Sequence, residues 1–133
     1  MSIPEGSAGS EIMSELRILI VDHEAIRDGI RELLAKHKEW VICGEAIDGV
    51  EAIEKAKSLS PDVVLMDVSM PRMDGIQAAK VLSLEAPNAK IVIVSQNDPG
   101  VIRRQAVEAG VAGYIAKSAL ALELVPTLEK ITF

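Results

Sequence analysis

Aromatic residues, cysteine and long apolar runs are all scarce in this chain of 133 residues. The one Trp, one Tyr and one Phe leave the core to be built from Val, Ile, Leu, Ala and Met. The single cysteine, Cys43, cannot form an internal disulfide, which excludes a disulfide-stapled secreted fold and predicts a cytoplasmic protein. No apolar run approaches the roughly 18 residues of a membrane-spanning helix, so we expect no membrane partner.

Clustered positive charge is also missing. The 14 Lys and Arg residues are scattered along the chain, and the formal net charge is -6. Binding to nucleic-acid phosphates requires a concentrated basic surface, so the chain itself is not expected to contact DNA or RNA. Aliphatic residues, in contrast, are abundant: a hydrophobic content of 49% at this length predicts one globular domain with a core of its own.

The N-terminal segment differs in composition from the rest of the chain. Residues 1–15 are rich in Ser, Gly and Glu and have no periodic apolar pattern. They also lack the basic residues and the apolar stretch of a signal peptide. We therefore expect residues 1–15 to be a disordered leader and residues 16–133 to form the domain.

Four short apolar runs in the domain each end in a reactive polar residue. The runs lead into Asp22, Asp67, Ser95 and Lys117, and turn residues flank them. Such runs are typical of buried parallel strands in an α/β fold. Because ligands of an open α/β sheet bind beyond the carboxyl ends of its strands, the four polar side chains should meet at one edge of the sheet. Two carboxylates, a hydroxyl and an ammonium suit a divalent cation and a phosphoryl group.

Helical patterns alternate with these runs and with one further predicted strand, residues 40–46. Apolar residues between 26 and 34 are spaced i, i+4, i+7 and i+8, and Asp48 is placed to cap the next helix. Further helices are expected over residues 75–85, from residue 99 and over 121–132. Pro126 removes a backbone donor, so we expect the last helix to start late or to bend there. The pattern predicts five βα units.

Two stretches now identify a resemblance. They are PDVVLMDVSMPRMDG, which ends at Gly75, and AGVAGYIAKS, which ends at Ser118. From about residue 16 to 131 the chain resembles the receiver domain of two-component response regulators. Ser118, rather than Pro, after Lys117 resembles the NarL/FixJ branch. The resemblance implies a flavodoxin-like, three-layer α/β sandwich with five helices and a five-stranded parallel sheet in the order 2-1-3-4-5.

The resemblance also implies a role for each polar strand end. Asp67 would be the phosphoacceptor, forming an acyl phosphate with a phosphoryl group from a sensor histidine kinase. Ser95 would donate a hydrogen bond to the phosphoryl oxygens, and Lys117 would neutralise charge as a compact ammonium. Tyr114 stands where similar receivers carry an aromatic switch, whose ring would turn inward on phosphorylation. The partner-binding surface would then change.

Mg²⁺ is the cofactor that the resemblance implies, with Asp22, Asp67 and the backbone carbonyl of Ser69 as ligands. The chain departs from the family pattern here, because one acid is missing after the first strand. In one alignment Asp22 keeps the strand-end role and Glu24 replaces the second acid. In the other, Asp22 is the second acid and Val21 occupies the first position. The neighbouring histidine, at position 23, is expected to be an ordinary loop residue.

An alternative function remains open because of this missing acid. The chain could be a pseudo-receiver, a phosphorylation-independent protein-interaction module. It is not expected to be an enzyme beyond self-catalysed phosphorylation and dephosphorylation, and Ser69 stands where a haloacid-dehalogenase phosphatase would need a second acid. The expected partners are a sensor histidine kinase and a second copy of the chain. DNA would be bound only through an output domain that this chain does not include.

Overall fold

Strands and helices alternate along the chain. The computed structural model describes residues 15–68, 73–96 and 99–131. The strands are β2 (Leu16–Val21), β3 (Trp40–Ala46), β4 (Val63–Asp67), β5 (Lys90–Ser95) and β6 (Gly113–Ala116). The helices are α2 (Glu24–Leu34), α3 (Gly49–Leu59), α4 (Gly75–Glu85), α5 (Pro99–Glu108) and α6 (Leu120–Ile131), with a short 3₁₀ helix at Lys117–Ala119.

The five strands form one sheet in the order β3-β2-β4-β5-β6, and every neighbouring pair is parallel. This order is the 2-1-3-4-5 order predicted from the sequence, so the predicted flavodoxin-like fold is confirmed. Doubly wound sheets of this order bind their ligands at the point where the strand order reverses. In this chain the reversal lies between β2 and β4.

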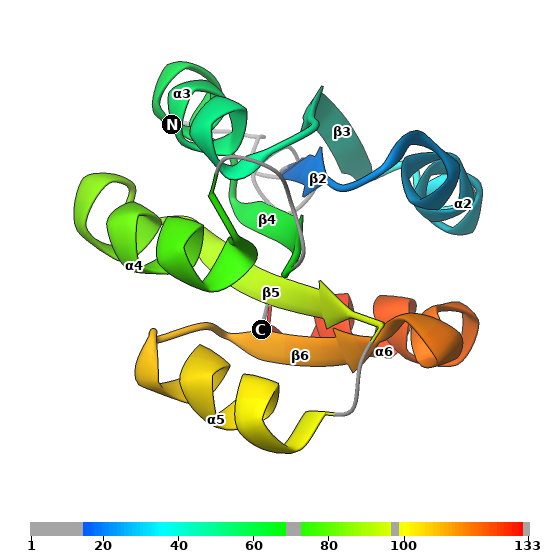
Figure 1. Ribbon diagram of the computed structural model, residues 1–133. Helices are drawn as coiled ribbons and strands as arrows, with labels where there is room; N and C mark the ends of the chain where they lie inside the picture. Colours follow the sequence, from blue (N-terminus) through cyan, green and yellow to red (C-terminus); the bar gives the residue numbers. More distant parts are fainter. Residues whose placement is uncertain (1–14, 69–72, 97–98, 132–133) are drawn as a thin grey trace.

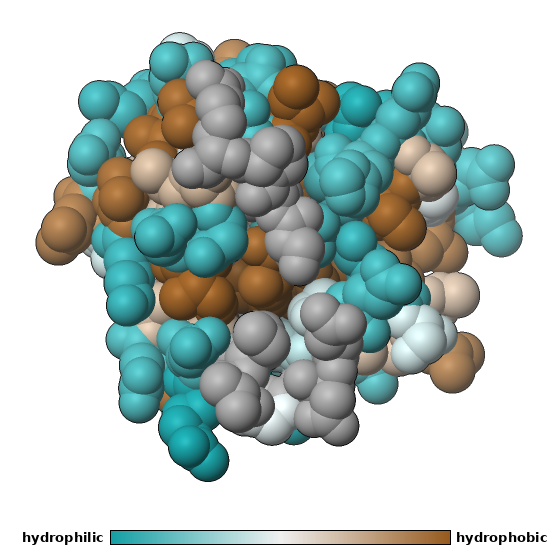
Figure 2. Space-filling model, viewed as in Figure 1, coloured by the Kyte–Doolittle hydropathy of each residue, from teal (hydrophilic) through white to brown (hydrophobic). Residues whose placement is uncertain are grey.

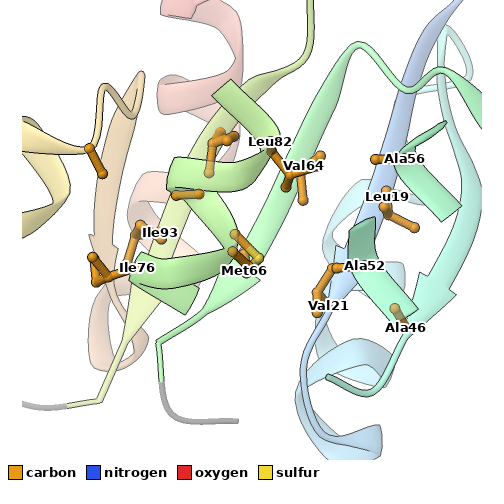
Figure 3. Close-up of a cluster of buried hydrophobic side chains, with 14 of the residues drawn as sticks. Leu19, Val21, Ala46, Ala52, Ala56, Val64, Met66, Ile76, Leu82 and Ile93 are labelled. Carbon is orange, nitrogen blue, oxygen red and sulfur yellow. The ribbon is translucent and has the colours of Figure 1, made fainter. Parts of the chain in front are cut away.

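Helices cover both faces of the sheet and so make three layers. In Figure 1, α3, α4 and α5 lie on one side of the strands, and α2 and α6 lie on the other. Alternate residues of each strand point to opposite faces. Leu19 and Val21 of β2 therefore belong to the cluster beneath α3 and α4, whereas Ile18 and Ile20 belong to the cluster beneath α2 and α6. Figure 3 shows the first cluster, to which Leu82 of α4 and Val64 of β4 both belong.

The central strand β4 is buried along its whole length. Its residues pack under helices on both faces, which explains why its sequence is a continuous apolar run rather than an alternating one. Hydrophilic residues cover much of the periphery of the molecule, and hydrophobic residues lie nearer the centre of the face seen in Figure 2. Among the helices of the described residues, none combines the length and apolar character that a bilayer crossing demands.

The last helix lies where it was predicted, over nearly the same residues. It begins at Leu120, immediately after the 3₁₀ helix, and continues through Pro126 to Ile131. Pro126 cannot donate to the carbonyl of Leu122 four residues earlier. Leu122 is an exposed residue, so water can reach that part of the helix. Of the two alternatives, a late start was therefore wrong, because the lost hydrogen bond falls on the solvent side of α6, and a bend at Pro126 stays a prediction. The predicted leader lies outside the described residues except for residue 15.

Candidate functional site

The carboxyl edge of the sheet brings the predicted polar residues to one level. Val21 pairs with Met66, so Asp22 follows β2 at the height where Asp67 ends β4. Ser95 ends β5 and pairs with Ala116, directly before Lys117. The apolar runs thus end in register. Asp22, Asp67 and Ser95 are buried, at 2–3% exposure.

Lys117 links the two acids. Its Nζ lies 3.2 Å from Oδ1 of Asp22 and 3.3 Å from Oδ1 of Asp67. The lysine side chain is itself 12% exposed, so little water screens these contacts. Two carboxylates and one ammonium leave a net negative charge in a buried pocket. Such a pocket favours a further cation.

Asp22 has one satisfied and one unsatisfied carboxylate oxygen. Oδ1 accepts a hydrogen bond from the backbone N–H of His23 at 2.7 Å and one from Lys117. Oδ2 is buried and has no hydrogen-bond partner among the described residues. Burial raises the pKa of the Asp22 carboxyl above 3.8, and the nearby Asp67 charge adds to this, against the lowering effects of the backbone N–H and Lys117. The buried Oδ2 fits a cation ligand.

His23 approaches the same place from the solvent side. It is the N-cap residue of α2, its side chain is 64% exposed, and its Nε2 lies 3.9 Å from Oδ2 of Asp67. His23, Asp22 and Asp67 each offer a ligand atom within 4.8 Å of the others. The sequence interpretation as an ordinary loop residue missed this proximity. The available signal was its position directly after the strand-end acid.

The strand register also bears on the two alignments of the acid segment. Asp22 stands at the strand end, level with Asp67, as in the alignment that gives Asp22 the first position. Glu24 is the first residue of α2, is exposed, and is not one of the three residues of the ligand group. The residue between Asp22 and Glu24 is His23, whose side chain is an imidazole. The predicted ligand Ser69 lies outside the described residues.

The backbone after Asp67 is held by a glycine. Gly75, the first residue of α4, donates its N–H to the carbonyl of Val68 at 2.8 Å. A Cβ at position 75 would lie 2.2 Å from the carbonyl oxygen of Asp67, far inside contact distance. Asp74 and Gln77 form a capping box that starts α4 at this point. Close packing of a helix start against the strand end thus fixes where Asp67 stands.

Tyr114 lies one strand away from the acids. It is half-buried in β6, and the Arg103 guanidinium of α5 stands 5.0 Å above its ring. This distance suits a cation–π contact between the helix and the strand. The predicted switch residue is therefore packed at the junction of α5 and β6, whereas the contacts of Lys117 join the two buried acids.

Comparison with known proteins gives the family. The response regulator receiver domain model matches residues 18–129. The chain is 38% identical over 117 residues to the chemotaxis protein CheY of Thermotoga maritima, covering 87% of this chain and 97% of that protein. It is 43% identical over 107 residues to a protein-glutamate methylesterase/protein-glutamine glutaminase of Carboxydothermus hydrogenoformans, covering 79% of this chain and 30% of that enzyme.

Solved structures agree with the curated relatives. A two-component response regulator of the LuxR family from Aurantimonas superposes with a TM-score of 0.83 and 34% sequence identity, covering 89% of this chain and 85% of that one. The chain spans about half the length, or less, of several curated relatives that it matches. The chain belongs to the receiver domain family of two-component response regulators, and regulators of the NarL and LuxR type are among its relatives.

Proposed function

We propose that this receiver accepts a phosphoryl group on Asp67 from a sensor histidine kinase, and that the modification changes a partner-binding surface. The observation that carries the proposal is the Lys117 ammonium, which lies within 3.3 Å of two buried carboxylates at the ends of adjacent strands. Burying two acids around one lysine carries a desolvation cost that their mutual attraction repays only in part, so such a cluster points to a use in function rather than in stability. Phosphoryl transfer, which depends on positioning and charge neutralisation, is such a use.

Each residue of the site would have a separate role in this transfer. An Asp67 carboxylate oxygen forms a bond to phosphorus while the bond from phosphorus to the donor histidine nitrogen breaks, and the donor ring, protonated at its other nitrogen, takes the electron pair and leaves as a neutral imidazole. Lys117 stays paired with the oxygens as negative charge moves onto Asp67. The buried Ser95 hydroxyl donates to a phosphoryl oxygen. Mg²⁺, held by Asp22 and Asp67, would neutralise further phosphoryl charge.

The surface that responds would be formed by α5, β6 and α6. Tyr114 and Arg103 join α5 to β6, and Val107 of α5 and Leu122 of α6 are large, exposed hydrophobic residues. New contacts between the phosphoryl group, Ser95 and Lys117 would bias this surface between two arrangements. A second copy of the chain is the partner we propose for it. The single cysteine suits the cytoplasm, where a kinase would act.

Intact mass after incubation with acetyl phosphate tests the phosphoacceptor role. We expect the chain to gain one phosphoryl group when Mg²⁺ is present and none when it is chelated. Asp67→Asn should gain none, whereas Asp28→Asn, which removes an exposed carboxyl on α2, should behave as the parent. A parent chain that gains nothing from acetyl phosphate or from a phosphorylated kinase would favour the pseudo-receiver, in which the fold is kept for protein interaction alone.

A further inference from the structure

An imidazole stands in an otherwise carboxylate site. His23 follows Asp22 directly, and its Nε2 lies 3.9 Å from Oδ2 of Asp67. The ligand atoms of these three residues lie within 4.8 Å of one another. Its side chain is 64% exposed, so the ring can rotate without displacing core residues. The arrangement offers one nitrogen and two oxygens to an ion at the sheet edge.

The second observation is the orphaned oxygen of Asp22. Lys117 occupies Oδ1 of both acids, whereas Oδ2 of Asp22 is buried and has no hydrogen-bond partner among the described residues. A buried carboxylate oxygen without a hydrogen-bond partner destabilises the folded state, so a bound cation would relieve that cost. A cation that binds this oxygen remains clear of the ammonium, which is held at the other oxygen.

We propose that His23 is a ligand of this ion and that the site selects a divalent transition-metal ion, with Zn²⁺ as its probe, over Mg²⁺. Mg²⁺ is a hard cation that prefers oxygen ligands, whereas imidazole suits Zn²⁺ and its first-row neighbours. With metal–ligand distances of about 2.0–2.1 Å, two ligands of a tetrahedral zinc ion lie roughly 3.3 Å apart. The gap between Nε2 of His23 and Oδ2 of Asp67 closes to this value with a displacement of roughly half an ångström.

The inference deepens the proposed function and rests on it, because both place a divalent cation beside Asp22 and Asp67. It differs from that proposal in the identity of the ion. Two carboxylates and a neutral imidazole carry one negative charge fewer than three carboxylates would. The site is therefore less attractive to Mg²⁺ and has a nitrogen ligand for softer ions.

Calorimetric titration with Zn²⁺ and with Mg²⁺ measures this preference as a ratio of dissociation constants. The parent is compared with His23→Asp, which restores an all-oxygen site, and with His37→Asp, which makes the same exchange at the only other histidine of the chain. We expect Zn²⁺ to bind the parent more tightly than Mg²⁺. The ratio should fall by about tenfold or more in His23→Asp, since loss of even a second-shell partner has an effect of that size. It should stay at the parent value in His37→Asp.

A nitrogen NMR spectrum of the parent provides a test that needs no variant. Zn²⁺ should shift the ring nitrogens of His23, and His37, stacked on Trp40 with ring centroids 4.3 Å apart, should not respond. An equal ratio in parent and His23→Asp, or an unshifted His23 ring, would overturn the inference. Acetyl phosphate modification of Asp67 with Mg²⁺, scored by mass, would then still support the proposed function. If His23→Asp loses tight Zn²⁺ binding but Asp67 of the parent is never modified, the identity of the ligand is supported and the proposed phosphoacceptor role fails.

Discussion

The buried acid that follows β2 should lower the stability of the metal-free protein. Asp22 is 2% exposed, its Oδ2 has no hydrogen-bond partner among the described residues, and it shares one ammonium with Asp67. Replacing Asp22 with Asn keeps the shape of the side chain and removes its charge. We expect Asp22→Asn to be more stable than the parent at neutral pH in the presence of a chelator.

The magnitude follows from two opposing contributions. Relief of the buried, unpartnered charged oxygen contributes about 1–3 kcal/mol. Loss of the carboxylate charge beside Lys117 removes about 1 kcal/mol, since the ammonium can still donate a hydrogen bond to the neutral amide oxygen. The net gain is about 1 kcal/mol in the free energy of unfolding. For a domain of this size it raises Tm by roughly 4 °C.

The stability difference between Asp22→Asn and the parent should depend on pH, whereas a difference caused by packing would not. The pKa of Asp22 is raised in the folded state by burial, above its ordinary value of 3.8. The folded state therefore holds the proton more tightly, and stability falls as the pH rises through the folded pKa. Asp22→Asn and the parent should unfold at similar urea concentrations below pH 3.8 and diverge above it.

Urea unfolding followed by circular dichroism measures the effect, with Asp48→Asn as the matched control. Asp48 is equally buried, but its side chain accepts the N–H of Glu51 as the N-cap of α3, and Asn caps a helix about as well as Asp. Saturating divalent cation should reverse the order, because an ion at 100 times its Kd stabilises the parent by about 2.7 kcal/mol. A variant less stable than the parent in chelator at pH 7 would refute the reasoning.

Three further perturbations test the packing and charges that position the site. Gly75→Ala should lose about 1–3 kcal/mol in urea unfolding and lower acetyl phosphate modification, because its Cβ would meet a backbone oxygen at 2.2 Å. Gly29→Ala on α2, whose Cβ meets nothing within 4 Å, should gain up to about 1 kcal/mol, and equal effects at both glycines would contradict this account. Leu128→Ala should cost about 3 kcal/mol because the side chain is fully buried, whereas the exposed Leu122→Ala should stay within about 0.5 kcal/mol. Glu45→Gln should cost about 1 kcal/mol at pH 7, because two arginines of α2 pair with this carboxyl and lower its pKa below 4.5. The stabilisation by this pairing is present above pH 4.5 and is lost as the pH falls through the pKa of the folded state. A cost that persisted at pH 2 would argue for packing instead.

The strands could be predicted because burial on both faces leaves a direct mark in the sequence. The run before Asp67 consists only of apolar residues, and β4 is buried throughout. Turn residues bounded each run, so the strand predicted over residues 40–46 has the bounds of β3. The runs that lead into Asp67, Ser95 and Lys117 likewise end where β4, β5 and β6 end. Asp48 was likewise predictable as a cap, since capping depends on a hydrogen bond between residues only three positions apart in the sequence.

The contacts that the sequence left undetermined join residues far apart along the chain. The register of β2 against β4 decides that Asp22, and not its neighbour, is level with Asp67. The approach of His23 to Asp67 follows from that register and from the position of His23 between the end of β2 and the start of α2. Similarly, Glu45 of β3 contacts Arg27 and Arg31 of α2, a network that no local pattern indicates. The choice between the two alternatives at Pro126 depends on which side of α6 faces water, which the local sequence does not give.

The central claim is that Asp67 is the residue that carries the phosphoryl group, and trapping the acyl phosphate tests it most directly. Borohydride reduces an acyl phosphate to an alcohol, which would convert a modified Asp67 to homoserine. Peptide mass spectrometry of the chain after acetyl phosphate, Mg²⁺ and borohydride should then find homoserine at position 67 and unchanged aspartate at position 22. Homoserine at another aspartate, with position 67 intact, would contradict the account.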